Sequence, residues 1–149
     1  MQIIDFYKCD DKAHRLSQIK AADWSAAVFL YDILCSKRFY EMFGDMSILL
    51  LLTDGDRLVS FCTLAQHDEI YPTTLTPWVG FVYTFPEYRG KRCAGQLIAY
   101  AKTLARQQGH EYLYISTDHT GLYEKYGFEY MTDMKTISGD TARVYAARL

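Results

Sequence analysis

Hydrophobic residues recur along the chain with two spacings, one typical of strands and one typical of helices. Nearly unbroken or alternating apolar runs predict strands at residues 3–7, 47–53, 58–66, 78–85, 112–116, 129–137 and 141–148. Apolar residues at helical spacing predict helices at residues 11–22, 25–43, 94–108 and 119–126. The run 47–53 is apolar at almost every position, which indicates a strand covered on both faces.

Capping and turn residues mark the ends of these segments. Asp10 or Asp11 is placed to cap the first helix, and Ser25 is placed to cap the second. The sequence Asp-Gly-Asp at residues 54–56 predicts a hairpin turn. Residues 67–77 contain two prolines and three threonines, and we expect them to form a loop that borders a site.

The order of the elements is a strand, two helices, three strands, a helix, a strand, a helix and two strands. This mixed order predicts an α+β fold built on one sheet. No repeat, linker or low-complexity segment divides the chain, so we expect a single domain over residues 1–149. A chain of this length buries roughly 70% of its unfolded surface and sustains a core without disulfides.

Composition argues against several classes of function. Half of the residues are hydrophobic and 23% are charged, as in a globular protein. The formal net charge of −2 does not suggest the basic surface that binds nucleic acid. The aliphatic run 48–52 is too short to span a bilayer, and residues 1–11 do not resemble a secretory signal. We therefore expect a cytoplasmic protein that binds neither nucleic acid nor membrane.

The cysteines and histidines form no metal or disulfide pattern. Cys9, Cys35, Cys62 and Cys93 are widely spaced, which is typical of reduced thiols packed as small apolar residues. The four histidines are scattered as well, and no group of them has zinc-ligand spacing. We expect no bound metal.

A basic loop joins a predicted strand to a predicted helix at residues 86–96, Pro-Glu-Tyr-Arg-Gly-Lys-Arg-Cys-Ala-Gly-Gln. The first turn of a helix has unpaired backbone N–H groups and the positive end of the helix dipole. Small residues in the loop let a phosphate approach the backbone, and Arg89, Lys91 and Arg92 add positive charge. The loop is therefore either an anion site or a basic, solvated turn. It matches neither the Walker loop nor the dinucleotide fingerprint.

Two segments in register resemble the GNAT superfamily of N-acetyltransferases. Residues 89–94, Arg-Gly-Lys-Arg-Cys-Ala, resemble the motif that follows a strand and opens a helix in that family. Residues 121–128, Gly-Leu-Tyr-Glu-Lys-Tyr-Gly-Phe, resemble its second motif. The strong matches cover residues 78–130, and upstream only the order of the elements agrees. The resemblance implies a mixed, mostly antiparallel central sheet flanked by helices.

The resemblance also implies that acetyl-CoA is the cosubstrate. A splayed strand would hold the pantetheine and the carbonyl oxygen, and the basic loop would hold the pyrophosphate. The residues implied to bind the cofactor are Val82, Tyr83, Thr84, Arg89, Gly90, Lys91, Arg92, Cys93, Ala94, Gly95 and Gln96. Arg92 stands where the family has glycine. There are two alternatives. Arginine is energetically costly at this position if the backbone needs a positive φ, whereas its side chain would instead be useful if it paired with a phosphate of CoA.

The implied chemistry is direct attack of an amine on the thioester, with Tyr123 as the acid that protonates the leaving thiolate. A phenol of pKa about 10 is still protonated when a thiolate of pKa about 8.5 appears. The alternative is a core tyrosine with its hydroxyl at the surface, because the chain contains 13 tyrosines.

The sequence defines the general base less well. Asp68 is the first candidate, and Glu69 lies beside it at the edge of the same loop. Asp118 is placed to cap the following helix. His119 has the intrinsic pKa of a base but is equally suited to a structural role.

The predicted function is transfer of an acetyl group from acetyl-CoA to a primary amine of a small molecule or peptide. The alternatives are a non-catalytic acyl-CoA-binding sensor or regulatory module, and a partner-binding domain that has lost the cofactor. The sequence leaves the acceptor and the oligomeric state open, a homodimer included. Four aromatic residues either line an acceptor pocket or belong to the core: Trp24, Tyr31, Tyr71 and Trp78.

Overall fold

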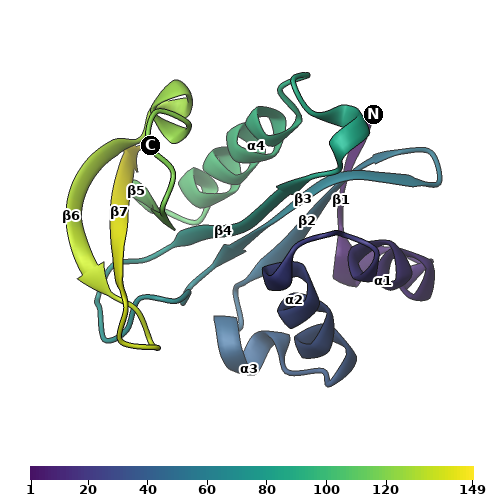
Figure 1. Ribbon diagram of the computed structural model, residues 1–149, viewed down its shortest axis with the longest axis horizontal. Helices are drawn as coiled ribbons and strands as arrows, with labels where there is room; N and C mark the ends of the chain where they lie inside the picture. The colour runs from purple at the N-terminus through teal and green to yellow at the C-terminus, as the bar shows by residue number, and fades with distance from the viewer.

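The computed structural model describes all 149 residues and is built on one seven-stranded sheet (Figure 1). Its order is β1-β2-β3-β4-β5-β7-β6, and every neighbouring pair is antiparallel except β4 and β5. This architecture confirms the predicted α+β class with a mostly antiparallel sheet. The strands are β1 (Gln2–Asp5), β2 (Ile48–Asp54), β3 (Arg57–Ala65), β4 (Trp78–Thr84), β5 (Tyr112–Thr117), β6 (Glu129–Lys135) and β7 (Thr141–Arg148).

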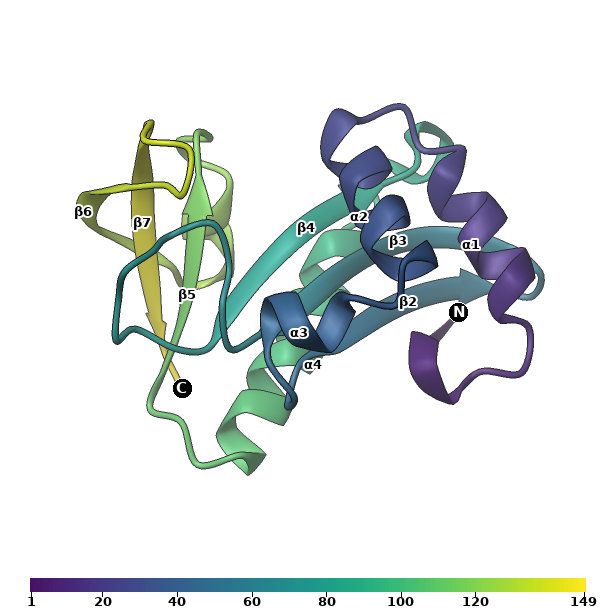
Figure 2. The ribbon, with the colours of Figure 1, turned by 90° about the horizontal axis from the view of Figure 1, so that it is seen from below.

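Helices cover both faces of the sheet. The α-helices are α1 (Lys12–Lys20), α2 (Ser25–Cys35), α3 (Phe39–Phe43) and α4 (Cys93–Gln107). The short 3₁₀ turns are η1 (Phe6–Lys8), η2 (Pro86–Tyr88) and η3 (Tyr123–Tyr126). Helices α1 to α3 lie on one face and α4 lies on the other (Figures 1 and 2). None of these helices combines the length and the apolar character that crossing a membrane requires.

Strand β2 shows why its run of leucines forms a strand between two layers of helix. Successive side chains of a strand point to opposite faces. Leu49 and Leu51 accordingly pack in the core cluster under α1 to α3, and Leu50 and Leu52 pack in the cluster under α4. All four are buried, as the sequence predicted for a strand covered on both faces.

The prediction of one helix over residues 25–43 is wrong. Helix α2 ends at Cys35, and Lys37 adopts a left-handed conformation with φ of 59° before α3 begins. Ser36 stabilises the end of α2, because its Oγ donates to the carbonyl of Asp32 at 2.8 Å. The turn redirects the chain so that Phe39 and Phe43 both enter the core. Apolar spacing continues through the turn, so the sequence pattern did not reveal the break.

Strands β4 and β5 pair only at one end. Trp78 lies opposite Tyr114, and Val79 lies opposite Ile115, and no later pair follows. The two strands then diverge, and the sheet opens between them (Figure 2). Their separation creates the opening at which the candidate site residues meet.

The pairing of β4 with β3 is also irregular at this level of the sheet. The register shifts between Phe61 and Thr63 of β3, and Phe81 and Val82 of β4 have no partner there. Phe81 has φ of 50°, which is rare for a bulky residue. A β-bulge of this kind re-aims side chains and bends the strand.

Helix α1 is fastened to the turn between β2 and β3 by the buried side chain of Arg15. Its Nη1 donates to the carbonyl of Asp56 at 3.0 Å, and its Nη2 donates to the carbonyl of Gly55 at 3.2 Å. Its Nε lies 3.1 Å from the carboxylate of Asp11. One guanidinium thus joins the start of α1 to a hairpin about 40 residues later in the chain.

We expect Arg15→Met to lower the free energy of unfolding by about 2 kcal/mol, because methionine keeps an apolar stem but removes the charged donors. Urea unfolding would measure the change. Arg38→Met is a matched control, since Arg38 is exposed and pairs only with Glu41, and it should change the value by less than about 0.5 kcal/mol. Equal effects of the two substitutions would contradict a structural role for Arg15.

Candidate active site

A cleft of about 940 Å³ opens where β4 and β5 diverge. Its walls come from the end of β4, the loop and first turn of α4, the turn η3 and the segment before α2. Nine of the residues predicted from the sequence line it: Val82, Tyr83, Thr84, Arg89, Gly90, Arg92, Cys93, Ala94 and Tyr123. The structure therefore brings together the two segments that the sequence singled out separately.

Four of the predicted residues do not line this cleft. The ammonium of Lys91 lies 5.6 Å from the ring centre of Tyr88, and Gln96 is exposed on α4. Gly95 faces Tyr126, because a Cβ at this glycine would lie only 2.8 Å from Tyr126 Cε1. Asp68 lies elsewhere, beside β4.

Several lining residues were not predicted to bind the cofactor. Lys125 and Tyr126 belong to the segment that resembles the second GNAT motif, so their position in that segment was an available signal. Trp24 was considered for the acceptor pocket and His119 for the base, and both line the cleft. Leu122 lies in the same segment as Lys125 and Tyr126, and Tyr88 lies in the basic loop at residues 86–96, whereas no sequence signal pointed to Asp23.

Cationic side chains surround the loop before α4. Arg89 folds back on β4, where its Nε donates to the carbonyl of Thr84 at 3.0 Å and its guanidinium lies 5.5 Å from the ring of Tyr83. Arg57 approaches the ring of Tyr88 to 5.5 Å, but it pairs with Glu87 at 3.0 Å and does not line the cleft. Arg89 and Arg92, together with the N-terminus of α4, make this end of the cleft favourable for a multiply charged anion.

Arg92 is the N-cap residue of α4 and lies in the left-handed region, with φ of 59° and ψ of 30°. The position therefore does require a positive φ, which was the condition under which arginine would be costly. A non-glycine residue in this conformation costs roughly 1–2 kcal/mol. Arg92 nevertheless lines the cleft with a free guanidinium.

Tyr123 is buried at the wall of the cleft, with 6% of its surface exposed. Burial, with a smaller contribution from the thiol of Cys62, raises the pKa of Tyr123 to about 12. The phenol is therefore protonated throughout the physiological range. The ammonium of Lys102 on α4 donates to the carbonyl of Tyr126, and this contact ties η3 to α4.

Asp68 lies after β3 and packs directly against Gly80 of β4. A Cβ at Gly80 would overlap with Asp68 Oδ2, so a larger residue at position 80 would displace the carboxyl group. Asp68 Oδ1 accepts a hydrogen bond from the backbone N–H of Glu69 at 2.8 Å, and Oδ2 is buried without a partner. Burial raises the pKa of Asp68 to about 7.

The other aromatic candidates have separate positions. Trp24 stacks on Tyr83 with ring centres 5.7 Å apart. Trp78 is completely buried, and its Nε1 donates to the carbonyl of Leu75, so it belongs to the core. Tyr71 is 69% exposed, and Tyr31 lies under the ammonium of Lys20.

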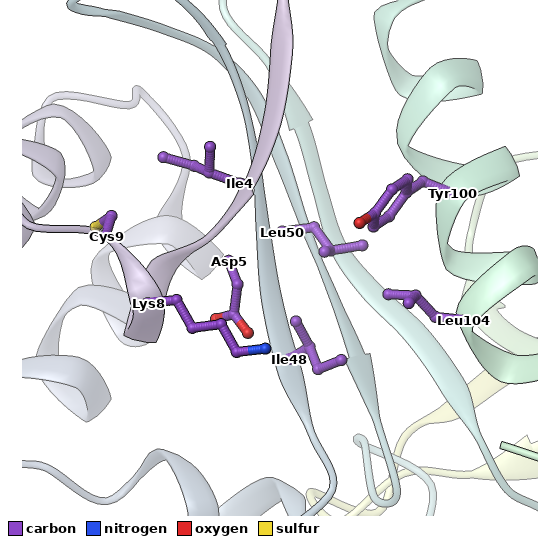
Figure 3. A pocket seen from close by; sticks show the side chains of 8 residues that line it. All are labelled: Ile4, Asp5, Lys8, Cys9, Ile48, Leu50, Tyr100 and Leu104. Atoms are coloured by element: carbon purple, nitrogen blue, oxygen red, sulfur yellow. The ribbon is translucent and has the colours of Figure 1, made fainter. Parts of the chain in front are cut away.

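A second, smaller cavity of about 360 Å³ lies between β1, β2 and α4 (Figure 3). Its walls are mostly apolar, with Lys8 and Asp5 at one side. No predicted site residue lines it.

The sequence profile of the acetyltransferase (GNAT) domain family matches residues 45–130. The match spans more than half of the chain and includes the cleft loop and Tyr123. The chain therefore belongs to the GNAT acetyltransferase family. A search of curated proteins found no significant match.

Solved structures of acetyltransferases share the whole fold. A GNAT family acetyltransferase from Elizabethkingia anophelis with acetyl-CoA bound has a TM-score of 0.68 at 16% identity, covering 99% of this chain and 97% of that one. An acetyltransferase from Streptococcus agalactiae has a TM-score of 0.70 at 18% identity, covering 99% and 98%. The aminoglycoside 6′-N-acetyltransferase from Enterococcus faecium has a TM-score of 0.68 at 15% identity, covering 99% and 97%.

We expect Arg92→Gly to stabilise the protein without ligand by about 1 kcal/mol, because glycine adopts the left-handed conformation freely. Thermal unfolding without CoA would measure the gain. Arg106→Gly, in the last turn of α4, is the contrasting control and should destabilise the protein by about 1 kcal/mol. A loss of stability in Arg92→Gly would mean that the arginine side chain makes contacts that outweigh the backbone cost.

Proposed function

We propose that this protein is an N-acetyltransferase that transfers the acetyl group of acetyl-CoA to a primary amine of a small molecule or peptide by direct attack. The observation that carries the proposal is the cleft between β4 and β5, which joins an anion-binding helix terminus to a protonated, buried tyrosine. The proposed catalytic unit spans residues 1–149, since strands from both ends of the chain belong to the same sheet.

The dimensions and chemistry of the cleft fit CoA. The pantetheine would lie along Val82 to Thr84, and the pyrophosphate would lie at the first turn of α4. Gly90 and Ala94 leave the backbone accessible there, and Arg89 and Arg92 supply charge.

The reaction requires three events. The amine nitrogen forms a bond to the carbonyl carbon, the C–S bond breaks, and the amine loses a proton while the thiolate gains one. Tyr123 would donate the proton to the sulfur, and Asp68 would accept the proton from the amine, directly or through water. Backbone N–H groups at the irregular part of β4 would stabilise the oxyanion.

Burial raises the pKa of both proposed catalytic groups. For Tyr123, with its pKa raised to about 12, the phenol holds the proton that it would donate but is a weaker acid than an ordinary tyrosine, so its role depends on its position beside the sulfur. A carboxyl group of pKa about 7 is a stronger base than an ordinary aspartate and is still ionised in a large fraction of molecules near neutral pH. We also propose a cytoplasmic location, because all four cysteines are free thiols, as a reducing compartment maintains them.

We expect Tyr123→Phe to slow acetyl transfer in single turnover by about 10²- to 10⁴-fold, the usual contribution of a positioned acid. Phenylalanine keeps the ring, so the melting temperature and the affinity for acetyl-CoA should barely change. Single-turnover rates are preferred because product release can mask the chemical step. Tyr126→Phe, on the same 3₁₀ turn, is the control for a hydroxyl that the proposal does not use in catalysis.

Full single-turnover activity in Tyr123→Phe would show that solvent protonates the thiolate and that Tyr123 is structural. Binding of acetyl-CoA without transfer to any amine would instead favour the acyl-CoA-binding sensor. A thermal-shift titration distinguishes these cases from a domain that has lost the cofactor, because ligand at 100 times its Kd adds about 2.7 kcal/mol.

The pH dependence of kcat/KM tests Asp68. A base is active when deprotonated, so activity should fall as the pH drops below about 7, the raised pKa of this carboxyl. An alkylamine acceptor has a pKa near 10, so the effect of its own protonation on kcat/KM appears at a higher pH than the effect of Asp68. Asp68→Asn should lose the limb near pH 7 and should lower the rate by about 10²-fold or more. Asp32→Asn, on the exposed side of α2, is the control and should retain the fall in activity near pH 7. If Asp68→Asn also retained this fall, Asp68 would be excluded as the base.

A further inference from the structure

Three aromatic rings surround the ring of Phe81, the residue of β4 that has a positive φ. The ring of Phe81 lies 5.6 Å from that of Phe43 and 6.4 Å from those of both Trp24 and Phe29. Phe29 stacks nearly parallel to Phe81, with an interplanar angle of 14°, yet half of its surface is exposed. The cluster therefore presents an aromatic surface to solvent beside the irregular part of β4.

Two unpaired oxygens lie next to this surface. Asp68 Oδ2 and Thr63 Oγ1 are both buried and have no hydrogen-bond partner. Both approach Gly80, the residue that precedes Phe81: a Cβ at Gly80 would overlap with Asp68 Oδ2 and would lie 3.3 Å from Thr63 Oγ1. Buried polar atoms without partners are rare and call for an explanation.

The unpaired oxygens and the aromatic rings lie on the same face of the sheet. Phe61 and Ala65 of β3 pack in the cluster under α1 to α3, so Thr63, which lies between them, points to the same face. Phe81 packs against that cluster as well. The oxygens and the aromatic rings are therefore on one face of the sheet, opposite to α4.

We propose that the acceptor is a primary monoamine with an apolar, aryl-alkyl body, whose ammonium group binds at Asp68 and Thr63 and whose body packs on Phe29 and Phe81. This inference rests on the proposed function and adds the class of acceptor to it. An ammonium group donates three hydrogen bonds, which suits a carboxylate and a hydroxyl that lack partners. An aromatic body buries its surface on the rings and gains stacking energy.

A polycationic acceptor fits this site less well. Each additional ammonium group would need another carboxylate, since a charge buried without a partner is costly. The neighbouring carboxylate of Glu69 is exposed, and its Oε1 is directed to Ser116 on β5, whose Oγ donates to it at 2.8 Å. The side chains that α2 and its preceding residue contribute to the cluster, Phe29 and Trp24, are aromatic and uncharged.

The direct test is binding of 2-phenylethylamine and of spermidine to the CoA-loaded protein, measured by calorimetry at about pH 8.5, where a carboxyl of pKa about 7 is ionised. We expect 2-phenylethylamine to bind more tightly, and raised salt to weaken its binding only slightly. Tighter binding of spermidine would overturn the inference.

Variants locate the binding surface. Phe29→Ala removes one stacking partner and should weaken binding of 2-phenylethylamine by about 2- to 10-fold. Val28→Ala is the matched control, because Val28 is an exposed neighbour on α2 that contributes no ring, and its affinity should be unchanged. Asp68→Asn should weaken binding by about 10-fold or more, as expected for loss of a charged partner. Equal affinity in wild type, Phe29→Ala and Asp68→Asn would also overturn the inference.

An acetylation assay with the same amines separates the two proposals. Acetylation of polycations alone would overturn the acceptor class and leave the transferase function standing. Binding of 2-phenylethylamine that depends on Phe29, without any transfer, would support the acceptor site and overturn the transferase function. Absence of both binding and transfer with 2-phenylethylamine would overturn the acceptor class, and absence of transfer to every amine of a panel that includes amino acids and peptides would overturn the transferase function as well.

Discussion

The separation of β4 from β5 is the constraint on which the site depends. Two residue pairs hold the strands together at one end, where Trp78 is buried with Ile70 and Val144. Beyond that point each strand follows a different neighbour, β3 on one side and β7 on the other. A buried strand edge normally needs a partner for its N–H and C=O groups. The open edge of β4 is thus available to a ligand that extends along it.

Strained backbone occurs on both sides of this opening. Phe81 on β4 and Arg92 at the start of α4 have positive φ without being glycine. Such conformations persist where the surrounding structure enforces them, and they concentrate at functional sites. The rings of Trp24, Phe29 and Phe43 surround the ring of Phe81 and hold it in place. The positive φ of Phe81 lies at the β-bulge, where both Gly80 and Phe81 face the side of the sheet that carries Asp68.

Burial has opposite uses at the two proposed catalytic groups. It raises the pKa of both, because it disfavours the charged form of each. For Tyr123 the result is an acid that keeps its proton in the whole physiological range. For Asp68 the result is a carboxyl group that exchanges its proton near neutrality. One physical effect, applied to two residue types, therefore keeps the proton on the phenol and moves the titration of the carboxyl group toward neutral pH.

The sequence by itself determined the strands, the helix α4, the basic loop and the position of Tyr123, because these depend on local periodicity and on contiguous motifs. It did not reveal the break at Lys37, since the apolar spacing runs through the turn. It suggested Asp68 only by its place at a loop edge, whereas the contact with Gly80 arises from the pairing of β3 with β4. The gathering of Trp24, Phe29 and Phe81 joins α2 to a strand some 50 residues later. Only tertiary packing decides such contacts, because no local pattern records which distant residues meet.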